Sequence, residues 1–307
     1  MSMATKRAAI EGFTEQTIEA NGTRLSCRVG GDPGGPPVLL WHGFLGTSYT
    51  WRKVAPMLAA RGCAVLVPDM RGYGDSDKPP GPDGYDGLNL AADFRALVRE
   101  TGFGGGRPLT LVAHDMGVNP AMLWAHAHPA EVAALCVMEE PVLLADVLAK
   151  FIAYTPEATK RGGLWFWMMA LAPDMAEQLV GNGHERAFLA WNYDHYAADP
   201  AAIEPAAIDE YMRSFGAPGG VPGAFGVYRA VPRSVEQTAA LAGDKLRLPV
   251  LALGGEASMG AAMGGLAKLV AEHVEAAVLP GCGHFIPEEQ PEEVVRRMAA
   301  LVPGMAA

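Results

Sequence analysis

The 307-residue sequence predicts an α/β fold, with a mainly parallel sheet flanked by helices and interrupted by a helical insertion. Two observations support this fold class. Short apolar runs alternate with longer amphipathic segments along most of the chain. That alternation stops between residues 141 and 242, where no strand is recognisable but aromatic residues and methionines are frequent. We therefore expect a core formed by residues 1–140 and 243–307, and a helical cap formed by residues 141–242.

The expected strands are short apolar runs bounded by turn-forming or helical sequence. In chain order they are 38–41, 64–68, 109–113, 133–138, 249–253 and 275–279. Helices are expected where apolar residues recur at helical spacing or where glycine and proline mark an end, at 51–60, 88–100, 118–128 and 291–301. Open α/β sheets bind ligands at the carboxyl ends of their strands, so the loops there are where a site is expected.

Composition narrows the class of protein. Half of the residues are hydrophobic, 19% are charged and the net charge is −10. An acidic chain without a run of lysine or arginine is not expected to bind nucleic acid. The four cysteines are scattered without metal-ligand spacing, so neither a disulfide framework nor a metal site is predicted. No apolar run of about 18 residues predicts a membrane span, and no signal peptide is recognisable; we expect a cytoplasmic protein without a cofactor.

Asp115 follows an expected strand at the point where the chain enters a helix. The small residues Ala113 and Gly117 stand two positions away on either side. A sharp strand-to-helix turn needs small residues there, and such a turn lifts one side chain out of the sheet for nucleophilic attack. A serine would indicate acyl transfer, whereas a carboxylate indicates attack on a saturated carbon. The alternative is that Asp115 only caps the following helix.

His284 is the best-placed candidate for a base. It ends the glycine-rich segment 281–284, after the last expected strand and before a helix. Histidine titrates near neutral pH, so it can take a proton from water. A lone histidine is more often structural, but the other histidines lack this position at the carboxyl end of a strand.

Three glutamates are candidates for orienting His284. Glu139 and Glu140 follow the strand at 133–138, and Glu256 follows the strand at 249–253. A carboxylate bonded to one imidazole nitrogen stabilises the imidazolium that forms when the other nitrogen takes a proton. The residues alone leave the choice open, because all three could equally be solvated loop acids.

A glycine-containing loop follows the first expected strand, at residues 42–46. It can direct the backbone N–H of Phe44 toward the nucleophile. Together with the N–H of Met116, it would form an oxyanion hole. His42 is counted among the pocket residues, where it is expected to hold the loop backbone rather than to take part in the chemistry.

In combination, these motifs resemble the α/β-hydrolase superfamily with a cap domain, over residues 12–302. Residues 69–79 are similar to its loop after the fourth strand, and the His-Asp-x-Gly elbow resembles that of its epoxide hydrolases and dehalogenases. Three segments resemble the Cif-like bacterial epoxide hydrolases: 138–141, 228–230 and 279–284. There the acid follows the sixth strand, so the resemblance implies that Glu139 is the triad acid.

The resemblance implies a reaction in two steps. Asp115 attacks carbon and forms an alkyl-enzyme ester, and His284, oriented by Glu139, activates the water that hydrolyses it. Tyr228 matches the tyrosine that protonates the epoxide oxygen. The family's second donor, a Tyr or His in the first cap helix, aligns with Phe166, which cannot donate a proton.

Other cap residues are therefore expected in the pocket. Trp165 takes the second donor's place if the alignment shifts by one residue. Trp167 matches the halide-binding tryptophan of fluoroacetate dehalogenases. Tyr193, His195 and Tyr154 are further candidates for the missing donor.

Two alternatives remain beside an epoxide hydrolase. A haloalkane or haloacetate dehalogenase could use the same three residues, but those families commonly carry Trp or Arg after the nucleophile, where this chain has Met116. Fluoroacetate dehalogenases carry another arginine where this chain has Asn119. A non-catalytic ligand-binding protein on this fold is the second alternative, and the intact set of three residues argues against it.

We therefore predict an epoxide hydrolase that acts with water on a small apolar or aromatic epoxide and has no membrane partner. The natural substrate stays open. So does the oligomeric state, although members of this family often form homodimers.

Overall fold

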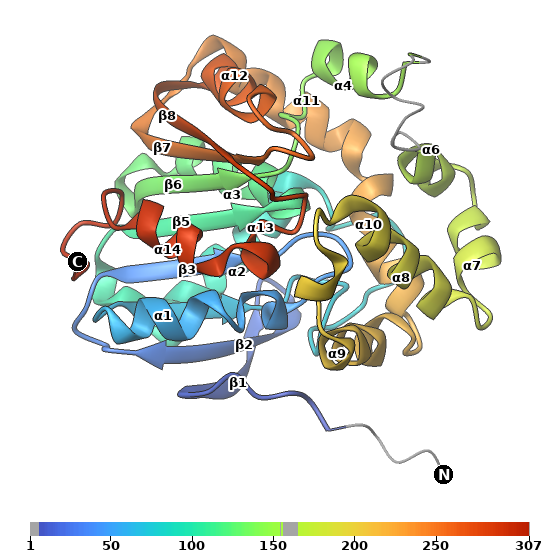
Figure 1. Ribbon diagram of the computed structural model, residues 1–307, viewed down its shortest axis with the longest axis horizontal. Coiled ribbons are helices and arrows are strands. Elements are labelled where there is room, and N and C mark those ends of the chain that lie inside the picture. The colour runs from blue at the N-terminus through green and yellow to red at the C-terminus, as the bar shows by residue number, and fades with distance from the viewer. Residues whose placement is uncertain (1–5, 154, 156–164, 307) are drawn as a thin grey trace.

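The computed structural model describes residues 6–153, 155 and 165–306. An eight-stranded sheet runs through the molecule in the order β1-β2-β4-β3-β5-β6-β7-β8 (Figure 1). Its parallel part contains β3 (Pro37–Trp41), β4 (Ala64–Pro68), β5 (Leu109–His114), β6 (Val132–Met138), β7 (Leu246–Gly255) and β8 (Ala271–Leu279). The predicted α/β fold with a mainly parallel sheet is confirmed, and all six expected strands are present.

A hairpin at one edge of the sheet was not among the expected elements. Strands β1 (Phe13–Ala20) and β2 (Thr23–Gly31) are antiparallel, and β2 also pairs antiparallel with β4. The turn between them is Asn21-Gly22, with φ of 48° and 71°. An Asn-Gly pair with positive φ at both residues is typical of a tight hairpin turn. The polar and largely exposed sequence of β1 obscures this signal.

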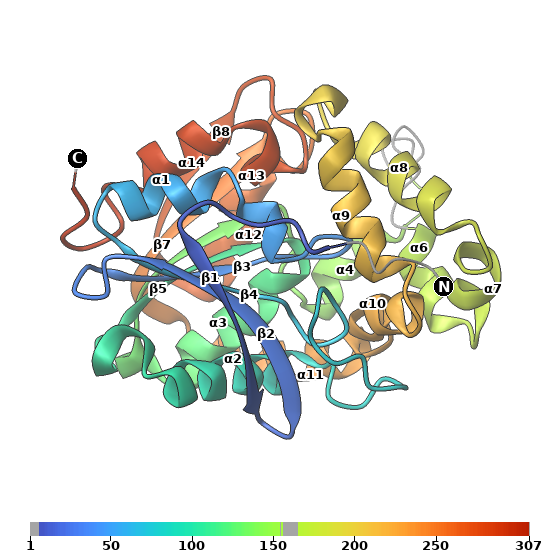
Figure 2. The ribbon, with the colours of Figure 1, turned by 90° about the horizontal axis from the view of Figure 1, so that it is seen from below.

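Side chains of the central strands alternate between two apolar layers, as the two-residue period of a strand requires. Val38 and Leu40 of β3 belong to the layer that includes α1 (Val54–Ala60) and α14 (Pro291–Met298). Leu39 and Trp41 belong to the opposite layer, with α2 (Gly87–Thr101), α3 (Val118–Ala127) and α12 (Ala262–Val270) (Figure 2). Because both faces are covered, these strands form continuous apolar runs.

Most of the helices between β6 and β7 lie beside the carboxyl ends of the parallel strands (Figures 1 and 2), and the last of them packs against α2 and α3. Those described are α4 (Ala145–Phe151), α6 (Trp165–Leu171), α7 (Met175–Val180), α8 (Glu185–Tyr196), α9 (Pro205–Phe215), α10 (Gly220–Arg229) and α11 (Val231–Gly243). A short helix, α13 (Ile286–Glu289), follows β8. Short 3-10 helices span Ser48–Trp51, Phe103–Gly106, Asp115–Gly117, Pro129–Glu131 and Pro200–Ala202.

Two further observations concern membrane-spanning helices and the cysteines. Within the described ranges, no helix combines the length and the apolar character needed to cross a bilayer. The cysteines Cys27, Cys63, Cys136 and Cys282 are buried free thiols. Cys136 lies in the core layer with α1 and α14, as its apolar neighbours in the sequence predict.

Candidate active site

Asp115 lies between the end of β5 and the start of α3, as predicted. Its backbone is in the left-handed region, with φ of 51°, a conformation that aspartate tolerates better than most non-glycine residues. A Cβ atom on Gly43 would lie 2.4 Å from the Asp115 Cβ, and one on Gly117 would lie 2.7 Å from the His42 carbonyl oxygen. Glycine is therefore needed at position 117 of the turn and at position 43 of the neighbouring loop after β3.

The Asp115 carboxylate is held by backbone N–H groups and by His284. The N–H of Phe44 donates to Oδ1 at 2.6 Å, and Nε2 of His284 lies 3.3 Å from Oδ2. Burial favours the protonated form, but the contacts with His284 and with the Met116 N–H lower the pKa of Asp115 below its usual value. Asp115 is therefore a carboxylate, which is the form that can attack carbon.

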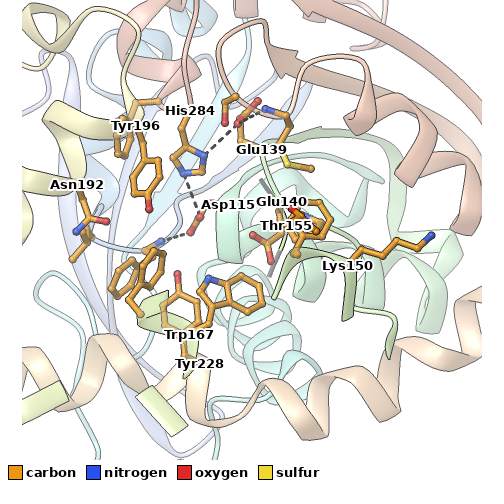
Figure 3. A pocket seen from close by; sticks show the side chains of 18 residues that line it. Asp115, Glu139, Glu140, Lys150, Thr155, Trp167, Asn192, Tyr196, Tyr228 and His284 are labelled. Atoms are coloured by element: carbon orange, nitrogen blue, oxygen red, sulfur yellow. Dashed lines mark hydrogen bonds and ion pairs between the residues drawn. The ribbon is translucent and has the colours of Figure 1, made fainter. Parts of the chain in front are cut away.

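His284 lies between two carboxylates. Its Nδ1 atom is 3.3 Å from Oε2 of Glu139, on the side of the ring opposite Asp115 (Figure 3). Glu139 also accepts a hydrogen bond from the Gly255 N–H at 2.7 Å, which fixes its carboxylate. Burial opposes the charged imidazolium, but Asp115 and Glu139 outweigh it and raise the pKa of His284 to about 10.

The structure separates the three candidate acids. Glu139 is next to His284, whereas Glu256 is exposed and accepts a hydrogen bond from the Gly281 N–H at 2.9 Å. Glu140 is buried and lines the cavity in front of Asp115. Only Glu139 among the three contacts His284. Glu256 is a solvated loop acid, which was the alternative that the sequence left open, whereas Glu140 is neither solvated nor in contact with His284.

His42 holds the loop that carries Phe44. Its Nε2 accepts a hydrogen bond from the Met70 N–H at 2.9 Å, so the proton is on Nδ1, which donates to the Gly43 carbonyl oxygen at 2.9 Å. His42 is fully buried and does not line the cavity, so its assignment to the substrate pocket is corrected. Its contacts are those expected of a residue that holds the loop backbone.

The loop of His284 is attached to the end of α8. The His284 N–H donates to the carbonyl oxygen of Tyr196 at 2.9 Å. A Cβ atom on Gly283 would lie 2.3 Å from the backbone nitrogen of Ala198, so glycine permits this close approach. On the other side, Nε2 of His114 lies 2.8 Å from the His284 carbonyl oxygen. The candidate base is thus fixed to the sheet and to a helix of the insertion.

A cavity of about 440 Å³ lies in front of Asp115 and His284 (Figure 3). Its apolar lining consists of Phe44, Leu45, Pro141, Phe151, Phe166, Trp167, Met259 and Phe285. Its other polar lining residues are Glu139, Glu140, Lys150, Thr155, Asn192, Tyr196, Tyr228 and Ser258. A cavity with mostly apolar walls and a few polar groups is typical of a small-molecule site.

Tyr228 lies across the cavity from Asp115, with its hydroxyl directed toward the carboxylate (Figure 3). Its ring is held by Phe44, Phe166 and Trp167, at centroid distances of 4.7, 5.5 and 5.2 Å. Burial, and then the charge of Asp115, raises the pKa of the phenol well above its usual value. Tyr228 is therefore a neutral phenol with a proton to give.

Phe166 and Trp167 line the cavity as predicted, but three other expected pocket residues do not. Trp165 is 42% exposed and packs on Trp191. Tyr193 is buried, and its hydroxyl donates to the Leu45 carbonyl oxygen at 3.3 Å. His195 is exposed and stacks on Trp191. These assignments are corrected, and Tyr154 lies outside the described residues.

Tyr196 and Asn192 are pocket residues that sequence reasoning missed. They are four residues apart on α8, so they lie on the same face of the helix and both reach the cavity. The Tyr196 hydroxyl is directed into the cavity from the side opposite Glu140 (Figure 3). Its ring centroid lies 6.5 Å from that of Phe166. Successive helical residues point about 100° apart, which is why its neighbour His195 faces outward.

The chain is similar in sequence and in fold to known hydrolases. The chain matches the model of the α/β hydrolase fold over residues 36–291. A soluble epoxide hydrolase from Corynebacterium sp. (strain C12) is 32% identical, over 92% of this chain and 95% of that protein. A fluoroacetate dehalogenase from Burkholderia sp. is 28% identical, over 93% of this chain and 92% of that protein. The crystal structure of the Cif epoxide hydrolase from Acinetobacter nosocomialis shares the fold, with a TM-score of 0.86, 24% identity, and coverage of 95% and 90% of the two chains.

Proposed function

Because this chain belongs to the α/β-hydrolase fold family, as its motifs predict, and is a hydrolase with epoxide hydrolases among its relatives, we propose that it converts an epoxide to a vicinal diol. The position of the Tyr228 hydroxyl across the cavity from Asp115 carries this proposal. Ring opening needs a nucleophile on one side of the ring and a proton donor on the other, and these two side chains supply them.

In the first step, a carboxylate oxygen of Asp115 attacks a ring carbon. The C–O bond of the epoxide breaks, an ester bond to Asp115 forms, and the departing alkoxide takes the proton of Tyr228. A phenol is a suitable donor because an alkoxide is a far stronger base than a phenolate. The negative charge of Asp115 is thereby transferred to the Tyr228 oxygen.

In the second step, His284 removes a proton from water, and the water oxygen attacks the ester carbon of Asp115. The N–H groups of Phe44 and Met116 stabilise the resulting oxyanion. Collapse breaks the ester bond, and the leaving alkoxide takes the proton from His284. The proton that remains on the Asp115 carboxyl restores the Tyr228 phenol, so the net reaction adds one water to one epoxide.

We assign the second proton donor to Tyr196. Phe166, at the position where the resemblance places a donor, stacks against Phe44 and has no polar hydrogen. Tyr196 brings a second phenol to the same cavity from α8. Trp167 can donate a hydrogen bond to the epoxide oxygen, but an indole N–H does not give up its proton to it. We also propose that residues 141–242 act as the cap over this site.

Dehalogenation is the second candidate function, favoured by Trp167 in the cavity wall and by the fluoroacetate dehalogenase relative. A haloacetate carries a carboxylate, which must be neutralised inside the site. The described lining holds no arginine, and the amino group of its lysine, Lys150, points away from Asp115 (Figure 3). An anionic substrate would instead meet the carboxylates of Asp115 and Glu139, which favours an uncharged epoxide.

A mass-spectrometric trap separates these functions from non-catalytic ligand binding. In His284→Gln, water is not activated, so the ester on Asp115 should accumulate. Styrene oxide should add its full mass to Asp115, whereas fluoroacetate should add nothing. His284→Gln with Asp115→Asn is the matched control and should stay unlabelled. Labelling by fluoroacetate alone would support the dehalogenase, and no labelling by either compound would exclude both enzymes.

A further inference from the structure

Glu140 is a buried carboxyl group in the cavity wall that the proposed reaction does not use. It is 2% exposed, and it lines the cavity next to Asp115 (Figure 3). Its Oε1 atom is buried without a hydrogen-bond partner in the described part of the chain. Glu139, its neighbour, points to His284 instead, so the two adjacent glutamates serve different surroundings.

Burial and the neighbouring carboxylates favour the protonated form of Glu140. Burial, followed by the negative charge of Asp115 and that of Glu139, raises the pKa of Glu140 well above its usual value, while His284 opposes this shift. A protonated carboxyl group donates one hydrogen bond through its O–H and accepts others through its carbonyl oxygen. The cavity therefore contains a neutral hydrogen-bonding group among aromatic side chains.

An unpaired buried polar group is unfavourable, and a ligand that pairs with it recovers that free energy. In cavities with apolar walls, a few such groups set the orientation and the identity of the ligand. The matching ligand group is an uncharged oxygen that accepts a hydrogen bond. A carboxylate would be repelled by Asp115, which the reaction requires in its charged form.

We propose that Glu140 binds an uncharged hydroxyl or carbonyl oxygen of the substrate, and so selects epoxides that carry such a group beside an apolar or aromatic body. The inference rests on the proposed function, because it assigns the substrate class of that same cavity. It adds a specificity residue to the reaction and leaves the roles of Asp115, His284 and Tyr228 unchanged.

Two epoxides that differ only in one hydroxyl group test this role, namely phenylglycidol and β-methylstyrene oxide. Wild type should prefer phenylglycidol. Glu140→Leu should lower kcat/KM for phenylglycidol by about tenfold to a hundredfold, the effect of one lost hydrogen bond, and leave β-methylstyrene oxide nearly unchanged. Glu140→Gln should keep the preference, because an amide also donates and accepts.

An equal loss on both epoxides in Glu140→Leu, or no loss on either, would overturn the proposal. Thermal unfolding of the variants checks that they fold, and Glu140→Met, which also lacks a strong hydrogen-bonding group, replaces the leucine variant if that one does not fold. Loss of the preference in a folded Glu140→Gln also contradicts the role.

Binding of unreactive alkenes separates this proposal from the proposed function. Cinnamyl alcohol and β-methylstyrene lack the epoxide but differ by the same hydroxyl group, and isothermal titration calorimetry measures their binding. Wild type and Glu140→Gln should bind cinnamyl alcohol more tightly, and Glu140→Leu should bind the two alike. If neither epoxide is hydrolysed, the proposed function fails. Tighter binding of cinnamyl alcohol by wild type and Glu140→Gln, but not by Glu140→Leu, would still support the role of Glu140. Equal binding of the two alkenes by all three proteins would overturn that role.

Discussion

The Nε2 atom of His284 lies 3.3 Å from the carboxylate of Asp115, so the candidate base and nucleophile are in contact before any substrate binds. Each favours the charged form of the other, which lowers the pKa of Asp115 and raises that of His284. His284 is therefore protonated while Asp115 is free. Esterification removes the charge of Asp115 and so lowers the pKa of His284, which then releases its proton to solvent and becomes a base; it takes a proton from solvent again when the Asp115 carboxylate is regenerated. The order of the two proposed steps follows from this.

Replacing Asp115 by asparagine should lower the pKa of His284 from about 10 toward its usual value. The asparagine imitates the uncharged ester, so one of the two carboxylates that stabilise the imidazolium is lost. The raised pKa keeps His284 protonated at neutral pH in wild type, and the variant should lose that proton as the pH rises through a lower range. NMR titration of the His284 ring measures both values; equal values would contradict the sequence of steps.

Tyr228→Phe should slow formation of the alkyl-enzyme from epoxides by about a hundredfold or more, the usual range for loss of a general acid. Hydrolysis of an ester already formed should be nearly normal, since that step depends on His284. Single-turnover mass spectrometry resolves the two steps. Tyr85→Phe is the matched control, because Tyr85 is a buried tyrosine whose hydroxyl bonds to Pro79 outside the cavity. Normal alkylation in Tyr228→Phe would assign the proton to another residue.

Tyr196→Phe should also slow alkylation, and Phe166→Tyr should restore part of the lost rate in the double variant. The rescue is expected because the second substitution places a phenol at the position from which Phe166 already contacts Tyr228. Pre-steady-state alkylation rates for the two variants and their combination measure the effect. An unchanged rate in Tyr196→Phe would show that Tyr228 acts without a second phenol.

Gly43→Ala should lower kcat by about a hundredfold or more, as the loss of one oxyanion donor does. The new Cβ atom would meet the Asp115 side chain at 2.4 Å, so either Asp115 or the loop that carries Phe44 must move. Gly265→Ala in α12 is the control: its Cβ atom meets nothing within 4 Å, and alanine favours a helix. Steady-state kinetics and thermal unfolding should show full activity for the control; full activity in Gly43→Ala would mean that the loop adapts without cost.

The sequence was sufficient to predict the six parallel strands and the positions of Asp115 and His284, whereas Glu139 was chosen over Glu140 and Glu256 through the family resemblance. Asp115, Glu139 and His284 each follow a strand. The carboxyl ends of parallel strands meet at one edge of the sheet, so residues that follow such strands are expected to lie near one another. The hairpin of β1 and β2 was not predicted. Strand β1 is largely exposed and its residues are mostly polar, so no apolar run marks it in the sequence.

The walls of the cavity were harder to predict than its centre. On a helix, an error of one position turns a side chain by about 100°, and this separates the predicted His195 from the observed Tyr196. The surroundings of Glu140, which lies in a loop, were equally hard to predict. The sequence does not reveal whether a glutamate is solvated or enclosed, since that depends on which side chains from distant segments surround it.

The hydrogen bond from the His284 N–H to the Tyr196 carbonyl oxygen joins the loop after β8 to the end of α8, next to the reacting groups. A displacement of α8 that widens the cavity would have to break this bond or move the loop of His284 with the helix. The width of the cavity and the position of the base are therefore coupled through one backbone hydrogen bond.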